Sequence, residues 1–256
     1  MTPVRQEGYQ FCQDLCIPCY QTDRQALLRP AAFMDLAQEI AYWAAQQLGF
    51  GYESLHIHHT AWVLVRMHVH FARLVHWRDA VTLKTWHKGA SGLLYLRDFD
   101  LQDAQGPGAV TATSSWVVMD ERTRRFVQPE SLQSLLQTEA VADAIPEPAP
   151  KLVLPLNPAD AGDSRSVPGM TGGAHTVVYS DLDINGHTNN ARYVAWAMDC
   201  LPPEVVTRPL KDLYINLQKE TILGDAVRLV RLQDGNCWYV EGRVGEKACF
   251  LLKLVY

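Results

Sequence analysis

Apolar residues along the chain change twice from a helix-like spacing to a strand-like one. In the first half, apolar residues recur mostly at intervals of three and four positions, which places them on one face of a helix: Phe33, Leu36, Ala37, Ile40 and Ala44. Runs rich in β-branched and aromatic residues follow, as is typical of strands: residues 62–71, 80–88, 93–101 and 109–120. This half is therefore predicted to form one helix and then four strands.

The second half repeats this order. It predicts a helix near 191–200 and four further strands: residues 213–220, 226–232, 237–244 and 247–255. Each half also begins with a strand-like run, at 11–20 and at 175–180. Each is therefore predicted to form a strand, a helix and an antiparallel meander, and one helix packed on one sheet makes the fold class α+β.

A proline-rich stretch separates the two halves. Seven of the fourteen prolines lie between residues 128 and 170, together with several Ala, Ser, Asp and Gly. Such a composition favours an extended connection over a packed element. The predicted organisation is an N-terminal unit at 1–128, a linker at 129–170 and a C-terminal unit at 171–256.

The two halves also resemble each other in sequence. Residues 22–37 align without gaps with residues 182–197, which pairs Asp23 with Asp183, and residues 78–84 align with 224–230. A diverged internal duplication is the simplest explanation.

Composition and charge exclude several classes of function. The formal net charge of −5 argues against a general nucleic-acid binder, whose surface is basic. The N-terminus carries neither a signal-peptide nor a transit-peptide pattern, and no apolar run reaches the roughly 18 residues of a membrane-spanning helix. We therefore expect a cytoplasmic protein without membrane insertion.

The segment Asp181–Asn190 is the densest polar cluster and has two interpretations. The pattern Asp181-x-Asp183-x-Asn185-Gly186 resembles the start of a calcium-binding loop. Such a loop needs a glutamate at its twelfth position, which here is Arg192. What is left is either a structural turn before a helix, or a catalytic cluster in which an extended chain projects residues 183, 185 and 187 to one side.

The duplicate favours catalysis. At the position of His187 the first half has Leu27, and at the position of Glu220 it has Leu74. The histidine is therefore not required to build the turn. Ionisable residues in one half only indicate a single active site in a duplicated fold.

At these residues the sequence resembles the acyl-acyl carrier protein thioesterases, enzymes that release fatty acids during their synthesis. Residues 179–199, YSDLDINGHTNNARYVAWAMD, are similar to the family signature S-D-x-D-x-N-x-H-x-N-N-x-x-Y-x-x-W. Residues 116–129 and 62–66 are similar to family segments in the first half. The resemblance implies a tandem (double) hot-dog fold, in which each unit is an antiparallel sheet wrapped around one long helix. The lack of a transit peptide favours a bacterial-type member.

The resemblance also implies the site. Its catalytic residues would be Asp183, Asn185, His187 and Glu220. Plant members often have cysteine directly after that glutamate, whereas this chain has Thr221, so a cysteine nucleophile is excluded there.

The implied substrate is a long- or medium-chain fatty acyl thioester of acyl carrier protein, with no cofactor and no metal. The acyl chain would lie in an apolar tunnel of the N-terminal unit, for which the candidate lining residues are Phe33, Met34, Ile40, Trp43 and Trp62. The carrier protein is acidic, and the densest basic cluster that could bind it is Arg122, Arg124 and Arg125.

Thioester hydrolysis needs an activated water and a stabilised oxyanion. Glu220 and His187 are the candidates to activate water, and Asp183 could orient His187 or polarise the water. Asn185 could hold the water or the carbonyl oxygen. Backbone amides at the start of the following helix, residues 189–191, could bind the oxyanion.

Competing interpretations concern metal binding and the reaction. The histidines at 56, 58, 59, 68 and 70 raise the question of zinc, but no Cys or Asp accompanies them at ligand spacing. The competing functions are an acyl-coenzyme A hydrolase, a hot-dog dehydratase and a non-catalytic acyl-binding module. A non-catalytic acyl-binding module would not be expected to carry buried titratable groups, because burying them costs free energy without improving the binding of an apolar chain. A homodimer is an open expectation.

Overall fold

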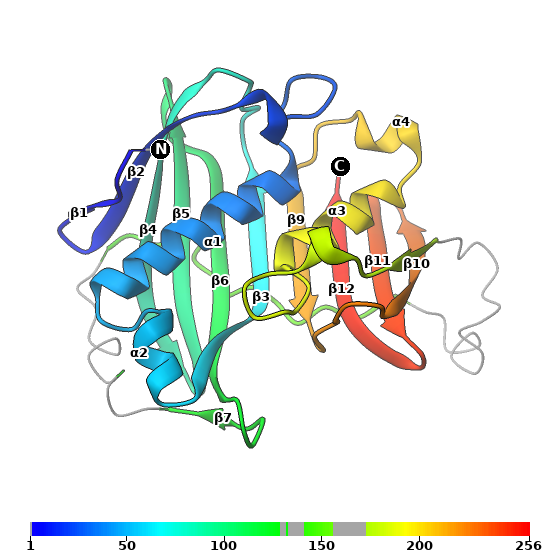
Figure 1. Ribbon diagram of the computed structural model, residues 1–256. Helices are drawn as coiled ribbons and strands as arrows, with labels where there is room; N and C mark the ends of the chain where they lie inside the picture. The colour runs from blue at the N-terminus through cyan, green and yellow to red at the C-terminus, as the bar shows by residue number, and fades with distance from the viewer. Residues whose placement is uncertain (1, 129–131, 133–140, 156–172) are drawn as a thin grey trace. The chain divides into compact units, whose positions relative to one another are not determined.

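The computed structural model describes residues 2–128, 132, 141–155 and 173–256, and it divides the chain into two compact units, 1–149 and 150–256. Most of the predicted linker 129–170 lies outside the described residues. Each unit contains a mostly antiparallel sheet and one main helix (Figure 1).

The first unit contains two helices and seven strands within the described residues. The helices are α1 (Pro30–Gln47) and α2 (Tyr52–Ile57). The strands are β1 (Arg5–Glu7), β2 (Gln10–Cys16), β3 (Thr60–Phe71), β4 (Ala80–Ser91), β5 (Leu94–Asp103), β6 (Gly106–Asp120) and β7 (Phe126–Val127). They pair in the order β1-β2-β4-β5-β6-β3, and β7 pairs with β6.

The described part of the second unit repeats this arrangement. Its helices are α3 (Asn190–Asp199) and α4 (Pro203–Val206), and its strands are β8 (Ala174–Thr176), β9 (Asp212–Leu217), β10 (Ala226–Asp234), β11 (Cys237–Val244) and β12 (Lys247–Val255). The order β8-β10-β11-β12-β9 is that of β2-β4-β5-β6-β3 in the first unit. The matching order confirms the α+β class and supports the duplication.

One detail of the predicted meander is wrong in both units. The first strand after the main helix, β3 or β9, pairs with the last strand of its unit, β6 or β12, and not with its successor in the chain. The strands β4, β5 and β6 form a meander in the first unit, which β7 extends, and β10, β11 and β12 form one in the second.

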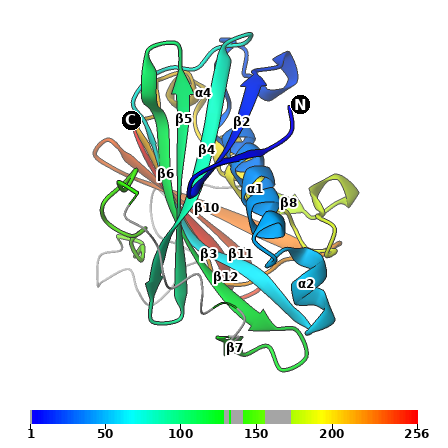
Figure 2. The same cartoon turned by 90° about the vertical axis from the view of Figure 1, so that its left-hand side faces the viewer.

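The sequence explains where helix α1 begins and ends. Pro30 occupies the first turn, where a missing amide hydrogen costs nothing, and Gly49, at a φ of 81°, follows the end of the helix. Its buried residues share one face, and the helix packs on β2 and β4 (Figure 2). The counterpart α3 is shorter, with 10 residues, and packs on β11 and β12. Within the described residues, no helix combines the length and apolar character needed to cross a bilayer.

A close contact between sheet and aromatic core marks the second unit. Phe250 on β12 is fully buried and packs against Tyr193 of α3, with ring centroids 4.9 Å apart. Gly242 on β11 makes room for this ring, because an added Cβ there would lie 2.1 Å from a Phe250 ring carbon.

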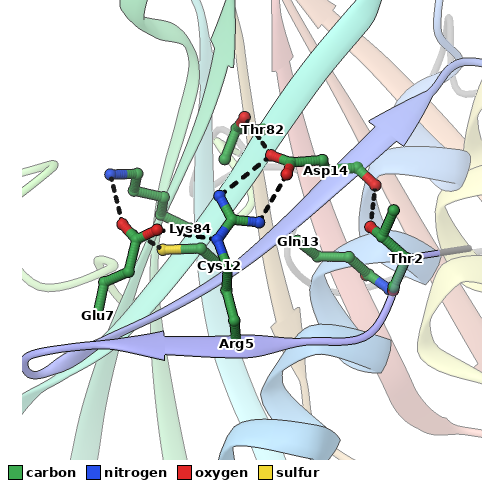
Figure 3. Close-up of polar contacts among 8 residues, drawn as sticks. All are labelled: Thr2, Arg5, Glu7, Cys12, Gln13, Asp14, Thr82 and Lys84. Carbon is green, nitrogen blue, oxygen red and sulfur yellow. Dashed lines mark hydrogen bonds and ion pairs between the residues drawn. The ribbon is translucent and has the colours of Figure 1, made fainter.

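The N-terminal hairpin is tied to β4 by a polar cluster (Figure 3). Asp14 accepts two hydrogen bonds from Arg5, at 2.7 and 3.3 Å, and one from Thr82, at 2.7 Å. Cys12 donates its thiol to Glu7, and burial raises the pKa of Cys12 to about 11. This thiol is therefore protonated at neutral pH and is not a nucleophile.

The described residues 141–149 pack on the first unit. Lys88 donates to the carbonyl of Ile145 at 2.6 Å and lies 3.2 Å from the buried carboxylate of Asp98, which also accepts the amide of Ala144 at 2.8 Å. Pro150 and Leu152 bond instead to Asn216 of the second unit: the Pro150 carbonyl accepts from its side-chain amide, and the Leu152 amide donates to its side-chain oxygen. The described stretch of the predicted linker is thus anchored at both of its ends.

Candidate active site

Asp183 closes the turn that carries the predicted catalytic residues. Its Oδ1 accepts hydrogen bonds from the backbone amides of Asn185, at 2.8 Å, and His187, at 3.1 Å. The Asp183 amide donates to the carbonyl of His187 at 2.8 Å, and Gly186 takes the positive φ of 76° in the turn. The aspartate side chain therefore organises the turn through backbone amides.

The first unit builds the same turn at Asp23. Its Oδ1 accepts hydrogen bonds from the amides of Gln25, at 2.8 Å, and Leu27, at 3.0 Å. Its amide donates to the Leu27 carbonyl at 2.8 Å, and Ala26, at a φ of 60°, stands where the second unit has glycine. The repeat is matched bond for bond, so Asp183 has a structural role that Asp23 shares.

The extended stretch predicted for residues 183, 185 and 187 is wrong, because residues 184–186 form a turn. The Asn185 side chain is exposed, and Oδ1 of Asp183 binds backbone amides. The orientation of the His187 ring by Asp183 stays a prediction, and the ion-pair contact that the structure gives this ring is with a different partner.

That partner is Glu220. The His187 Nε2 lies 3.6 Å from Glu220 Oε2, and the two side chains are 33% and 28% exposed. Both groups are thus reachable from solvent while partly withdrawn from it. The corresponding residues in the first unit, Leu27 and Leu74, can form no such pair.

Glu220 does not end a strand, although the sequence pattern predicts one to that residue. Strand β9 ends at Leu217, and the amides of Gln218 and Lys219 both donate to the carbonyl of Cys249, at 2.8 and 3.1 Å. Glu220 therefore stands in an irregular segment between these bonds to strand β12 and the bridge that Ile222 forms with His187.

The residues that follow the pair are joined to each other. The Thr188 amide donates to the Thr221 carbonyl at 2.9 Å, and the two Oγ1 atoms lie 2.7 Å apart. Tyr193 of α3 adds its hydroxyl, 3.0 Å from Thr221 Oγ1. The sequence interpretation does not identify these three residues.

Asp181 belongs to the loop and not to an ion site. Its buried Oδ2 accepts hydrogen bonds from His175 Nε2, at 2.8 Å, and from the Val178 amide, at 2.9 Å. Burial alone would raise the pKa of Asp181, but these hydrogen bonds hold it below its ordinary value. The His175 ring lies over Trp196, with centroids 4.2 Å apart. Asp181 and Asp183 both serve the loop itself, which agrees with the rejection of a calcium loop.

The start of α3 has fewer free backbone amides for binding an oxyanion than the sequence suggests. Asn189 is the N-cap of α3, and its side-chain oxygen accepts the amide of Ala191 at 2.9 Å. The amide of Arg192 donates to the Asn189 carbonyl at 2.9 Å. Two amides of the first turn are therefore already bonded within the helix start.

The predicted acyl-tunnel residues divide into two groups. Phe33, Met34 and Ile40 are fully buried on α1, and Trp62 is partly buried against the core of the first unit. Trp43 is instead 42% exposed, so the structure places it on the surface of α1.

The predicted docking residues lie on the turn between β6 and β7. Arg122, Arg124 and Arg125 are all exposed, and the turn is closed by Asp120, whose Oδ1 accepts the amide of Arg122 at 3.0 Å. The Arg122 guanidinium contacts the ring of His59.

The histidine-rich segment lies at the end of α2. His56, His58 and His59 are exposed there. Among the residues that the structure describes, no three His, Cys, Asp or Glu side chains come together as a metal site would require.

Comparison with known proteins decides the family. The family model described as the acyl-ACP thioesterase N-terminal domain matches residues 8–133, and that of the acyl-ACP thioesterase C-terminal domain matches residues 170–242. The chain belongs to the acyl-ACP thioesterase family. The resemblance inferred from the signature around His187 is confirmed.

Individual relatives of this acyl-ACP thioesterase family member are distant. The oleoyl-acyl carrier protein thioesterase 2, chloroplastic, of Arabidopsis thaliana is 25% identical over 238 residues, which cover 88% of this chain and 63% of that protein. The palmitoyl-acyl carrier protein thioesterase, chloroplastic, of the same plant is 29% identical over 231 residues, or 85% and 53%. The chain therefore spans less than two thirds of the length of these relatives.

Solved structures show the fold. The 12:0-ACP thioesterase from Umbellularia californica has a TM-score of 0.82 and 24% identity, covering 98% of each chain. An acyl-ACP thioesterase from Bacteroides thetaiotaomicron has a TM-score of 0.81 and 21% identity, covering 96% of this chain and 97% of that one. The predicted tandem hot-dog fold is confirmed.

Proposed function

We propose that this protein hydrolyses the thioester of long- or medium-chain acyl-acyl carrier protein and releases the free fatty acid. The observation that carries the proposal is the pair of His187 and Glu220, with 3.6 Å between ring nitrogen and carboxylate oxygen, in only one of two otherwise matching units. Membership of the acyl-ACP thioesterase family supports the reaction class.

In the proposed reaction, Glu220 accepts a proton from a water molecule as the water oxygen attacks the thioester carbonyl carbon. The tetrahedral intermediate then expels the thiolate. The proton passes from Glu220 through His187 to the leaving sulfur, which yields the free thiol and returns both residues to their starting states. Such proton transfers contribute on the order of 10²–10⁴ in rate. Asp183 holds the turn that carries His187, and the exposed amide of Asn185 is the proposed contact for the water or the carbonyl oxygen.

The substrate-binding parts of the proposal are placed on the first unit. Its buried apolar interior, which includes Phe33, Met34, Ile40 and Trp62, is the proposed environment of the acyl chain. The exposed Arg122, Arg124 and Arg125 form the proposed contact with an acidic carrier protein, because complementary charge steers such encounters.

A direct assay tests the function. The purified protein is mixed separately with acyl-acyl carrier protein and acyl-coenzyme A, and free thiol and free acid are both measured. Thiol and acid should appear in equal amounts with the carrier-protein substrate. Release only from coenzyme A would instead support an acyl-coenzyme A hydrolase. Dehydration of a hydroxyacyl substrate would support a hot-dog dehydratase, and binding without turnover would support a non-catalytic acyl-binding module.

Two variants test the site. His187→Ala and Glu220→Gln should each lower kcat by about 10²-fold or more, which is the range of a lost general acid or base. Near-normal turnover in both would show that the chemistry lies elsewhere. A cytoplasmic location and a homodimer stay predictions beside this proposal.

A further inference from the structure

Three buried hydroxyl groups are hydrogen-bonded to one another next to the His187–Glu220 pair: two on the residues that follow the pair in the chain and one on α3. Thr188, Tyr193 and Thr221 are buried side chains of the second unit. Thr221 Oγ1 lies 2.7 Å from Thr188 Oγ1 and 3.0 Å from the Tyr193 hydroxyl, which also accepts the Thr221 amide at 3.2 Å. We call these three residues the hydroxyl cluster.

The first unit provides a comparison within the same chain. Its turn and its main-chain bonds match those of the second unit, including the Leu28 amide donating to the Val75 carbonyl at 2.8 Å. The residues at the three positions of the hydroxyl cluster are nevertheless apolar there: Leu28, Phe33 and Val75. All three are buried, so the apolar residues fill the same space without hydrogen bonds between side chains. The fold therefore does not need the hydroxyls.

The cluster is present in the unit that has the pair and absent where Leu27 and Leu74 replace it. Thr188 directly follows His187, and Thr221 directly follows Glu220. The segment with Glu220 has left strand β9 at Leu217, and main-chain bonds hold it on both sides: the Gln218 and Lys219 amides donate to Cys249 of β12, and His187 forms a bridge with Ile222. The first unit has the same bridge, between Leu27 and His76, so the second unit differs by the side-chain hydrogen bonds of Thr221.

We infer that Thr188, Tyr193 and Thr221 are positioning residues that hold the backbones of His187 and Glu220 at the separation required for proton transfer. The inference rests on the proposed function. None of the three hydroxyls takes part in the chemistry; each acts through the catalytic neighbour that its hydrogen bonds fix.

Buried hydroxyls suit this task. A buried hydroxyl without a partner is unfavourable, so three that satisfy one another favour a single arrangement of the two segments. Apolar side chains of similar size pack in the same space but tolerate small shifts, because dispersion contacts have little directionality. A displacement of about 1 Å in a catalytic group can lower the rate by roughly 10²-fold.

The experiment uses variants that keep side-chain volume. Thr221→Val removes one hydroxyl without a cavity, Tyr193→Phe removes another, and Thr221→Ser restores the first. Tyr256→Phe is the matched control, because Tyr256 is a buried tyrosine of the same unit whose hydroxyl donates a long hydrogen bond of 4.0 Å to the sulfur of Met198 and does not belong to the hydroxyl cluster. Acyl-carrier-protein hydrolysis is followed at varied substrate concentration.

Thr221→Val and Tyr193→Phe should lower kcat by roughly 10- to 100-fold with KM within about twofold, because positioning acts on the chemical step and not on uniform binding. Thr221→Ser should recover most of kcat, and Tyr256→Phe should match the wild type. Wild-type kcat in both Thr221→Val and Tyr193→Phe would overturn the inference. A fall in Tyr256→Phe equal to that in Tyr193→Phe would also overturn it, because a general loss of rigidity would then explain both.

A second measurement does not depend on turnover. The His187 ring resonance is identified in labelled protein by its loss in His187→Ala and is followed at pH 7. Its chemical shift should change when Glu220→Gln replaces the neighbouring carboxylate, and should change in the same direction in Thr221→Val but not in Tyr256→Phe. An unchanged chemical shift in Thr221→Val overturns the inference even if the wild type hydrolyses no acyl-carrier protein. That absence of hydrolysis would instead overturn the proposed function.

Discussion

The buried pair of Lys88 and Asp98 provides a quantitative test of how residues 141–149 are held. The Asp98 side chain is fully buried and that of Lys88 is 6% exposed, with 3.2 Å between ammonium and carboxylate. Burial raises the pKa of Asp98, against the opposing effect of the Lys88 charge and of hydrogen bonds. Removing one charge should therefore cost much more than an exposed ion pair is worth.

The two single substitutions should differ in size. Lys88→Met leaves a buried carboxylate whose remaining bond to residues 141–149 is the Ala144 amide, so the free energy of unfolding should fall by about 3 kcal/mol. Asp98→Asn leaves Lys88 bonded to the Ile145 carbonyl at 2.6 Å and 3.5 Å from Asp143. That variant should lose only about 1–2 kcal/mol, because an amide oxygen still accepts the Ala144 bond.

The double variant separates the pair from its surroundings. Lys88→Met with Asp98→Asn should lose about 2 kcal/mol, well below the sum of the single changes, because no uncompensated charge is left buried. Urea unfolding followed by circular dichroism at pH 7 measures all four proteins. Losses that add to within about 0.5 kcal/mol would refute the reasoning, since they would show that the two charges do not depend on each other.

Three further changes have expected outcomes. Burial, with the nearby Arg97 charge, lowers the pKa of His87 to about 3. The unfolded chain takes up this proton near pH 6.5, so the free energy of unfolding falls as the pH drops below that value. Between pH 7 and 4, His87→Gln should lose about 3 kcal/mol less of this free energy than the wild type does, as measured by urea unfolding. Equal losses in the two proteins would contradict this. Gly242→Ala places a Cβ 2.1 Å from the ring of buried Phe250 and should destabilise the protein by about 1–3 kcal/mol in the same assay, whereas unchanged stability would mean that the ring moves freely. Asn189→Ala removes the N-cap of α3 and should lower stability by about 1 kcal/mol while Asn189→Ser restores most of it, and an equal loss in both variants would exclude a capping effect.

Local patterns in the sequence were enough for most of the elements. The helical spacing from Phe33 to Ala44 lies within α1, and the β-branched runs match β3 to β6 and β10 to β12 within a few residues. The short helices α2 and α4 have too few residues for a period to emerge. The pairing of β3 with β6 could not be predicted, because it joins residues far apart in the chain and leaves no local signal.

The candidate site was predictable in its residues but not in its contacts. The comparison of the two halves singled out His187 and Glu220, and the structure brings them within 3.6 Å. That comparison did not show that the Asp183 carboxylate binds backbone amides of its own turn. The spacing of one residue between Asp and Asn is compatible with a turn and with a strand, so it does not decide between them. The sequence comparison did not single out the hydroxyl cluster of Thr188, Tyr193 and Thr221, although each of these residues also aligns with an apolar residue in the first half. Thr and Tyr are common in regular secondary structure, so their presence alone gives no functional signal.

The repeat separates what both units share around this turn from what one unit adds. Asp23 and Asp183 close the same turn with the same bonds, so the backbone that presents the next residues is common to both units. One set of side chains around the turn differs: the half-buried His187 and Glu220, with the buried Thr188, Tyr193 and Thr221 next to them. If Leu27 and Leu74 of the first unit were replaced by histidine and glutamate alone, the backbone would match that of the second unit. The neighbouring buried residues would still be the apolar Leu28, Phe33 and Val75. If the hydroxyl cluster positions the pair, a working site requires the three buried substitutions as well as the histidine and the glutamate.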